Sequence, residues 1–366
     1  MTRIIRPTLL VNKEICERNI ARMVEKTAKL GIRFRPHFKT HQSVKIGAWF
    51  KQAGVKAITV SSVQMAEYFA TAGWNDITIA FPLNVLEIDN INQLAGKINL
   101  NVLVENVEAV NVLKVSLKFS IGVWIKIDTG YNRTGIDANA FSETDAVVRA
   151  ISGCDKLVFK GFLSHTGQTY TANSTDEIMR RHFDALLKLR TLKHRYLQEF
   201  GHVEISLGDT PAATLCENFD CVNELRPGNF VFYDLMQQNL GVCNFDDIAV
   251  RMVCPVVAIH RSRNEVVIHG GAVHFSKDSI RNTDGKKMFG RIVIEKDGGK
   301  ILLDTLNYLS ALSQEHGILK VAQSQLQNFY VGQLVEIIPV HSCLTANLMG
   351  HYRTATGELI EMMGKY

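Results

Sequence analysis

The stretch from residue 99 to residue 128 decides the fold, because it contains one strand, one helix and a second strand in succession. Its letters are NLNVLV at 99–104, VEAVNVLKVSL at 107–117 and VWIKID at 123–128. Short β-branched runs predict buried strands, and the segment between them has apolar residues at helical spacing. Strands that alternate with helices predict a mostly parallel sheet covered by helices.

The same unit recurs through the first 250 residues. The strand-like runs are Arg33–His37, Ala57–Val60, Ile77–Ala80, Asn99–Val104, Val123–Asp128, Val158–Ser164, Val203–Gly208 and Asn223–Gly228. Eight units favour a (β/α)8 TIM barrel over an open doubly wound sheet. No GxGxxG follows the first run, which weakens a dinucleotide-binding alternative. We therefore predict an α/β fold with a barrel over residues 13–246.

The pattern changes after residue 246, where short strand-like runs follow one another without long helices between them. Examples are Val250–His260, Glu265–His269 and Gly332–Pro339. This texture predicts a separate β domain. An early run, Thr8–Val11, precedes the barrel pattern and could pair into that domain, so we predict a β domain built from residues 1–12 and 247–366.

Composition excludes several classes of protein. The chain has 366 residues, of which 46% are hydrophobic and 21% charged, an ordinary globular composition. The excess of 41 Lys and Arg over 36 Asp and Glu is small and scattered, which makes no case for nucleic acid. No run reaches 18 apolar residues, and the seven cysteines form no CxxC pair. We expect a cytoplasmic protein with reduced thiols and no membrane partner.

Lys39 is the first candidate for chemistry, since the carboxyl ends of barrel strands form the active face. It lies just past the first run, flanked by Arg35, His37 and His41. A lysine crowded by cations in a desolvated pocket has a lowered pKa, which suits Schiff-base formation. The alternative is a solvated surface lysine, and most lysines are of that kind.

The last two barrel runs end in small residues, Gly208 and Thr210 after the seventh and Gly228 and Asn229 after the eighth. Loops at this place in barrels often bind a phosphate through backbone N–H groups and a hydroxyl. The alternative is ordinary turn chemistry. A phosphate site together with a Schiff-base lysine points to pyridoxal phosphate (PLP).

In the predicted β domain, His341 and Cys343 lie two residues apart. In an extended segment both side chains point to one side, so both could reach one metal ion, and imidazole with thiolate suits zinc. The alternative is a buried cysteine beside a structural histidine. His316 is a weaker candidate, and we interpret His269 and His274 as loop histidines.

Seven motifs, in chain order, together resemble those of one family. They are Arg6-Pro7-Thr8-Leu9-Leu10-Val11, Arg35-Pro36-His37-Phe38-Lys39-Thr40-His41, Asp128-Thr129-Gly130 with Arg133 and Gly135, Gly208-Asp209-Thr210-Pro211, Glu224-Leu225-Arg226-Pro227-Gly228-Asn229, Glu315-His316-Gly317, and Pro339-Val340-His341-Ser342-Cys343. The chain resembles the D-threonine aldolase and D-serine dehydratase family, PLP enzymes whose barrel is related to that of alanine racemase.

The resemblance implies a role for each matching position. Lys39 would carry PLP and act as a base on one face of Cα, and His341 with Cys343 would bind a divalent metal, with zinc the expected ion. Arg133 would lie near the phenolic oxygen of PLP and Tyr170 near its ring. The phosphate would be held by Gly208, Thr210, Gly228 and Asn229, and the other cofactor contacts implied are His37, His165, Asp209 and Tyr233. The usual assembly would be a homodimer.

The implied reaction is a lyase step on a β-hydroxy D-amino acid. The His-x-Cys pair at 341–343 resembles the dehydratases, which convert D-serine to pyruvate and ammonia, whereas D-threonine aldolases more often have His-x-Asp. Gln168 lies where aldolase relatives can offer a histidine. The alternative is retro-aldol cleavage to glycine and an aldehyde. An amino-acid racemase and a non-catalytic PLP-binding protein are lesser alternatives, and neither needs the metal pair.

Overall fold

The computed structural model describes residues 4–296 and 299–364, and these form two compact units. The first, which we call the barrel unit, comprises Ile20–Lys39 and Gly47–Phe230. The second, which we call the β unit, comprises residues 4–19, Thr40–Ile46 and residues 231–364. The two units are described separately below.

The barrel unit contains the predicted parallel strands, in the sheet order β2-β10-β9-β8-β6-β5-β4-β3. A parallel bridge between His37 and Thr59 joins the two ends of this order and closes the ring. The predicted TIM barrel is thereby confirmed. The strands are β2 (Arg33–Phe34), β3 (Ile58–Val60), β4 (Asp76–Pro82), β5 (Asn99–Val104), β6 (Ile121–Asp128), β8 (Leu157–Ser164), β9 (Glu204–Leu207) and β10 (Glu224–Leu225), and β7 (Ile136–Asp137) pairs with β6.

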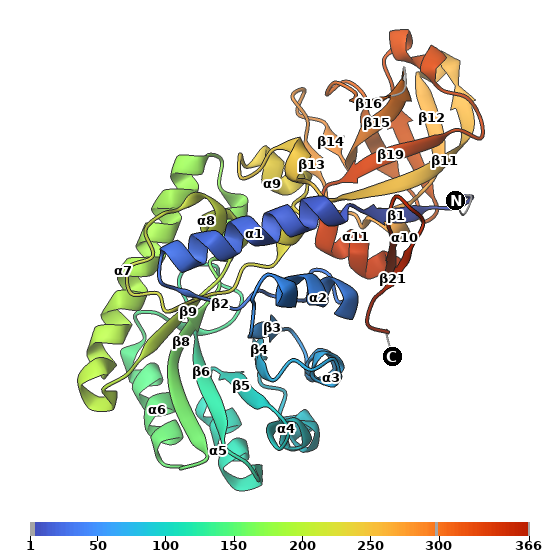
Figure 1. Cartoon of the computed structure of the whole chain (residues 1–366). Helices are drawn as coiled ribbons and strands as arrows, with labels where there is room; N and C mark the ends of the chain where they lie inside the picture. The colour runs from blue at the N-terminus through green and yellow to red at the C-terminus, as the bar shows by residue number, and fades with distance from the viewer. Residues whose placement is uncertain (1–3, 297–298, 365–366) are drawn as a thin grey trace. The chain divides into compact units, whose positions relative to one another are not determined.

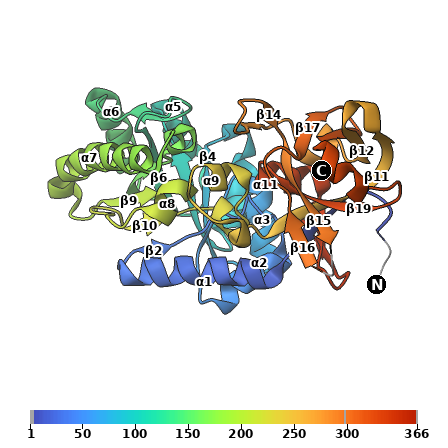
Figure 2. The same ribbon diagram turned by 90° about the horizontal axis from the view of Figure 1, so that it is seen from above.

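Helices cover the outside of these strands (Figures 1 and 2). Several begin at a polar residue whose side chain accepts a hydrogen bond from the first turn, such as Ser62, Asn106 and Ser174. Such caps explain where the helices start. The helices are α1 (Lys13–Lys29), α2 (Val44–Gln52), α3 (Val63–Thr71), α4 (Ile88–Ala95), α5 (Val107–Ser116), α6 (Phe141–Ser152), α7 (Thr175–Phe200) and α8 (Thr210–Leu215).

The β unit is built on an antiparallel sheet in the order β12-β18-β17-β15-β19-β11, which the pairing of β11 with β12 closes. Strand β1 pairs antiparallel with β11, so the N-terminal strand joins this unit as predicted. The other strands are β11 (Val250–His260), β12 (Glu265–His269), β13 (Ile280–Arg281), β14 (Lys287–Met288), β15 (Gly290–Lys296), β16 (Gly299–Leu302), β17 (Tyr308–Leu312), β18 (His316–Lys320), β19 (Leu334–Pro339), β20 (His351–Arg353) and β21 (Leu359–Glu361), with β1 at Thr8–Val11.

Three short helices complete the β unit: α9 (Leu235–Asn239), α10 (Ala272–Phe275) and α11 (Ser342–Met349). The interpretation of two histidines as loop residues is wrong, because His269 ends β12 and His274 lies in α10. His316, the weaker candidate, begins β18. Among the described residues, no helix is both long enough and apolar enough to cross a membrane.

Candidate active site

Backbone hydrogen bonds fix the segment that carries Lys39 at the end of the first barrel strand. The N–H of His37 donates to the carbonyl of Pro227 (2.9 Å), and the N–H of Phe38 donates to that of Thr59 (2.8 Å). The ring of Phe38 is fully buried, with the ring of Phe50 centred 5.0 Å away. The turn at Lys39 therefore follows Phe38, a residue that hydrogen bonding and packing hold in place.

One of the cations predicted beside Lys39 is already paired with carboxylates. Arg35 is neutralised by two carboxylates, with its Nε 2.6 Å from Oε2 of Glu224 and its Nη1 2.6 Å from Oδ1 of Asp76. His41 belongs to the β unit. Arg35 therefore adds no net charge beside Lys39, and the crowding of Lys39 by His41 stays a prediction.

A different set of cations, Lys39 with Arg133, Lys126 and Arg226, surrounds two histidines of the barrel unit. The pKa of His37 is held well below its ordinary value, first by burial and then by the charges of Lys39 and Arg226. The pKa of His165 is also lowered, by burial and by the charge of Lys39. Both imidazoles are therefore neutral at pH 7, and the positive charge of the cluster resides on the lysines and arginines.

Lys126 is a member of this cluster that the sequence analysis missed. It lies in β6, is buried, and donates from Nζ to the carbonyl of Ile127 (2.8 Å). Burial, and next the charge of Arg226, lower its pKa to about 8. The signal was present in the sequence, because a lysine inside the apolar run VWIKID is costly unless it serves a purpose.

Arg226 is the second residue that was missed as a site residue. Its side chain is buried and donates to Oγ of Ser206 (2.6 Å) and to the carbonyl of Ser164 (2.7 Å). Burial lowers its pKa to about 10, so it stays charged at pH 7. A buried cation with neutral hydrogen-bond partners favours the binding of an anion nearby.

The turn at Gly208 and Thr210 has the features of a cradle for an anion. A Cβ on Gly208 would lie 2.7 Å from the carbonyl oxygen of Arg226, so only glycine fits there. The hydroxyl of Thr210 is buried and has no hydrogen-bond partner among the described residues. The N–H of Thr210 donates to the phenolic oxygen of Tyr170 (3.1 Å). This places the hydroxyl of Tyr170 beside the residue predicted to hold the phosphate.

Asp209 holds the same turn in shape. Its Oδ1 accepts from the N–H of Ala212 (2.7 Å) and from the hydroxyl of Thr169 (2.9 Å). Its Oδ2 accepts from the hydroxyl of Thr166. The protein itself thus occupies both carboxylate oxygens, and Asp209 shapes the cradle rather than presenting a free acceptor. The ring of His165 joins the cradle through a short hydrogen bond from Nδ1 to the carbonyl of Gly208.

The remaining predicted cofactor contacts are divided between the units. Gly228 and Asn229 belong to the barrel unit, where Asn229 is buried at the start of a short 3-10 turn. Tyr233 belongs to the β unit and has a left-handed backbone with φ of 46°. A cavity of the barrel unit, of about 420 Å³, is lined by the paired charges of Arg35, Asp76 and Glu224. Since Asp76 and Glu224 are the first residues of β4 and β10, this cavity lies at the amino ends of the strands and is separate from the cradle.

His341 and Cys343 meet in the β unit, but their segment is not extended as predicted. His341 has extended backbone angles, whereas Ser342 opens α11 and places Cys343 in its first turn. The charges of the two side chains act on each other. Sγ of Cys343 also lies 3.5 Å from Oγ1 of Thr40, in hydrogen-bond contact.

The surroundings of this pair favour a thiolate beside an imidazolium. Burial opposes both charges, but the contact between the two side chains raises the pKa of His341 to about 10 and lowers that of Cys343. Nδ1 of His341 lies 2.6 Å from Oδ2 of Asp278. A carboxylate at Nδ1 leaves Nε2 of a neutral ring free to bind a metal, which is the usual arrangement at protein metal sites. Thiolate and imidazole are ligands that suit zinc.

Comparison with known proteins matches both units to one group of enzymes. Residues 11–235 match the model of the alanine racemase N-terminal domain, and residues 249–355 match that of a putative serine dehydratase domain. The D-serine dehydratase of Dictyostelium discoideum is 30% identical, over 96% of this chain and 93% of that protein. The chain belongs to the D-threonine aldolase and D-serine dehydratase family. It is therefore a PLP-dependent lyase.

Two solved structures extend this likeness. The D-threo-3-hydroxyaspartate dehydratase of Delftia sp. HT23 is 27% identical with a TM-score of 0.89, and the match covers 99% of this chain and 98% of that one. A cysteine-to-alanine mutant of the same enzyme was solved in a metal-free form. D-threonine aldolase from Filomicrobium marinum is 21% identical with a TM-score of 0.83, over 99% of this chain and 98% of that one, and shares the fold.

Proposed function

We propose that this lyase removes water from a β-hydroxy D-amino acid, with D-serine as the first candidate substrate and pyruvate and ammonia as the products. The observation that carries the proposal is the pairing of His341, whose Nδ1 contacts Asp278, with Cys343 two residues on, a nitrogen and a sulfur ligand of the kind that holds zinc. The likeness to the Dictyostelium D-serine dehydratase supports the choice of reaction.

The residues of the barrel unit fit PLP. A phosphate would give the buried hydroxyl of Thr210 the hydrogen-bond partner that it lacks among the described residues. The cations Arg133, Lys126 and Arg226 supply charge of the right sign for an anionic cofactor. We propose that Lys39 holds the cofactor through its amine. The further contacts proposed are His37, His165, Tyr170, Asp209, Gly228, Asn229 and Tyr233.

When bound, PLP withdraws electrons from Cα of an attached amino acid and so acidifies the proton there. We assign Lys39 as the base that would take this proton, because its amine belongs to the residue that would hold the cofactor. In this proposal the neutral imidazoles of His37 and His165 orient the bound cofactor without adding charge.

The β unit acts on the departing hydroxyl in this proposal. A divalent ion supplies Lewis-acid chemistry that helps a β-hydroxyl leave. His341 and Cys343 would hold the ion, and Asp278 would fix the ring of His341. Thr40, which contacts the sulfur of Cys343, follows Lys39 directly in the sequence. Loss of the Cα proton and the hydroxyl yields an enamine, which water hydrolyses to pyruvate and ammonia.

Product analysis on D-serine and D-threonine, with and without chelator, tests the reaction. We expect pyruvate from D-serine and 2-oxobutyrate from D-threonine, each with ammonia, and loss of both after chelation. Cys343→Ala is expected to lose elimination while it keeps bound PLP. Glycine and acetaldehyde from D-threonine would instead establish an aldolase, and unchanged activity of Cys343→Ala would exclude the metal role.

We also propose a homodimer, a cytoplasmic location, zinc as the ion, and the domain division at residues 13–246. The location is supported by the seven cysteines, none of which forms a disulfide in the described part of the chain, as expected in a reducing compartment. Sedimentation of the PLP-loaded protein tests the assembly, and a mass of about 41 kDa for the species in solution would exclude a dimer.

A further inference from the structure

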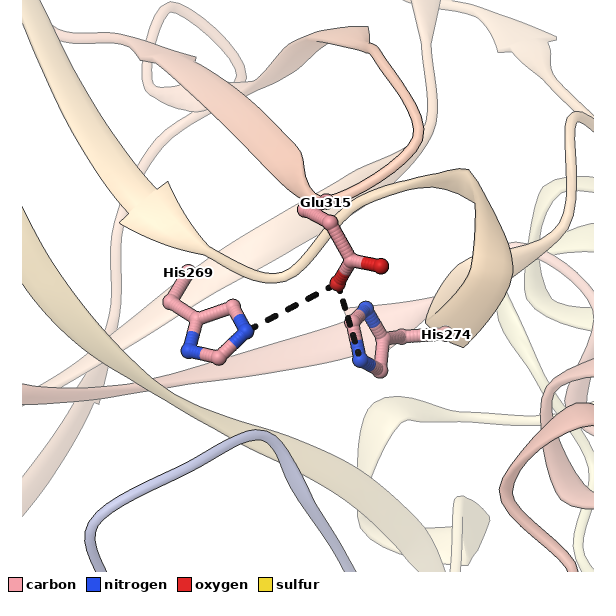
Figure 3. A group of neighbouring side chains, drawn as sticks. All are labelled: His269, His274 and Glu315. Carbon is pink, nitrogen blue, oxygen red and sulfur yellow. Dashed lines mark ion pairs between the residues drawn. The ribbon is translucent and has the colours of Figure 1, made fainter.

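Three further side chains of the β unit converge on one point. They are His269, His274 and Glu315, and Figure 3 shows the two imidazoles on either side of one carboxylate. Nε2 of His269 lies 3.7 Å and Nε2 of His274 lies 3.8 Å from Oε2 of Glu315. One potential ligand atom from each residue lies within 4.8 Å of the others.

The backbone holds these residues in place from both sides. Strand β12 pairs with β18 so that His269 stands opposite His316, next to Glu315. The N–H of Gly270 donates to the carbonyl of Glu315 (2.9 Å). A Cβ on Gly271 would lie 2.3 Å from the carbonyl oxygen of Gln314, so the two segments touch as closely as glycine permits. The three residues are therefore held by backbone segments that are hydrogen-bonded to each other.

We propose that His269, His274 and Glu315 form a second divalent-metal site, separate from His341 and Cys343. Two imidazoles and one carboxylate are a ligand set for zinc and similar borderline transition-metal ions. The separations of 3.7 and 3.8 Å are too long for direct hydrogen bonds. They are close to the roughly 3.3 Å edge between ligands at about 2.0 Å from a tetrahedral zinc.

Exposure supports a site that can close around an ion. The side chains of His269 and Glu315 are 41% and 49% exposed, so they can move by the remaining distance, whereas His274 is only 16% exposed and fixed. Three protein ligands leave a position for water. The site then joins β12, α10 and the turn before β18.

The hydrogen bonding of His274 makes this second site the weaker of the two. Its Nδ1 accepts from the N–H of Gly271 (3.1 Å), so the neutral ring carries its proton on Nε2, the atom that faces Glu315. An ion at Nε2 requires the proton to move to Nδ1, which breaks this contact and weakens metal binding. His341 pays no such cost, because Asp278 already accepts at its Nδ1.

Metal titration of the whole protein tests the proposal. The PLP-loaded protein is stripped with chelator and dialysed against increasing Zn²⁺, and bound zinc is counted per chain. We expect two phases, a tight one from His341 and Cys343 and a weaker one from the new site. Cys343→Ala should lose the tight phase and keep the weaker one. His269→Gln and Glu315→Gln should each weaken only the second phase by more than about tenfold.

The matched control is His316→Gln, which removes an exposed imidazole next to Glu315 and should leave both phases unchanged. Circular dichroism and the visible absorption of bound PLP check that each variant is folded. Co²⁺ binding gives a second readout. Co²⁺ bound to Cys343→Ala should still show visible absorption bands, but without the charge-transfer band that a thiolate ligand produces. The proposal is overturned if wild type binds a single ion, or if the weaker phase survives in both His269→Gln and Glu315→Gln.

Discussion

Removal of the carboxylate of Asp278, which contacts His341, should weaken metal binding although no proposed metal ligand is changed. The contact is short, 2.6 Å between Nδ1 of His341 and Oδ2 of Asp278. It fixes the ring and makes the imidazole a better donor to the ion. Asp278→Ala removes both effects, and Asp278→Asn keeps an acceptor but removes the charge.

The size of the effect follows from the exposure of the carboxylate. Loss of such a partner typically lowers metal affinity by about 10- to 100-fold. The side chain of Asp278 is 39% exposed, so solvent screening favours the lower end, about tenfold, which is about 1.4 kcal/mol. Asp278→Asn should lose less, because a neutral hydrogen bond is roughly half as strong as a charge-assisted one.

Competition with a chromophoric chelator measures the zinc affinity of each variant. The visible absorption of PLP should be unchanged, and saturating zinc should restore most of the elimination rate. Asp284→Ala removes an exposed carboxylate in the same unit and serves as the control. Wild-type zinc affinity in Asp278→Ala would refute the role that we give to the carboxylate.

Three other changes test the barrel unit. Lys126 has a pKa of about 8 instead of 10.5, so the unfolded chain binds more protons between these two pH values, and the free energy of unfolding should rise with pH across that window. Lys126→Met should abolish the rise and stabilise the PLP-free protein at pH 7 by up to about 3 kcal/mol. If the free energy of unfolding, measured by denaturant titration, changes with pH equally in both proteins, this reasoning is contradicted. Thr210→Val should leave the stability of the PLP-free protein unchanged or higher, because the buried hydroxyl has no partner among the described residues, yet PLP should dissociate about tenfold more readily in dialysis. Lys39→Ala should abolish the visible absorption of bound PLP, and a variant that keeps it would place the cofactor elsewhere.

The barrel could be predicted because its strands are buried on both faces and therefore appear as apolar runs. In β6, every residue from Ile121 to Ile127 is buried. The closing contact between His37 and Thr59 could not be read in this way, since a bridge outside the strands leaves no periodic pattern. Likewise α11 is too short for a helical period, which is why Cys343 was assigned to an extended segment.

Site residues were predictable where a local motif carried them and not where the fold assembled them. Lys39 and the pair His341 and Cys343 stand in short motifs. By contrast, His269 and Glu315 are 46 positions apart in the sequence and meet only through the register of β12 against β18. Register depends on which strands pair, and single-sequence patterns do not specify that.

The pairing of β1 determines when, during translation, this strand can complete its hydrogen bonds. Leu10 pairs with Arg251 in β11 and also with Arg353 in β20, so this strand cannot complete its hydrogen bonds until more than 340 further residues have been made. The barrel unit lies between these partners in the chain and can fold while translation continues. Because His341 and Cys343 emerge from the ribosome late, the nascent barrel can form its proposed cofactor site before either proposed metal ligand exists. Under these proposed roles, metal insertion would follow synthesis of the barrel.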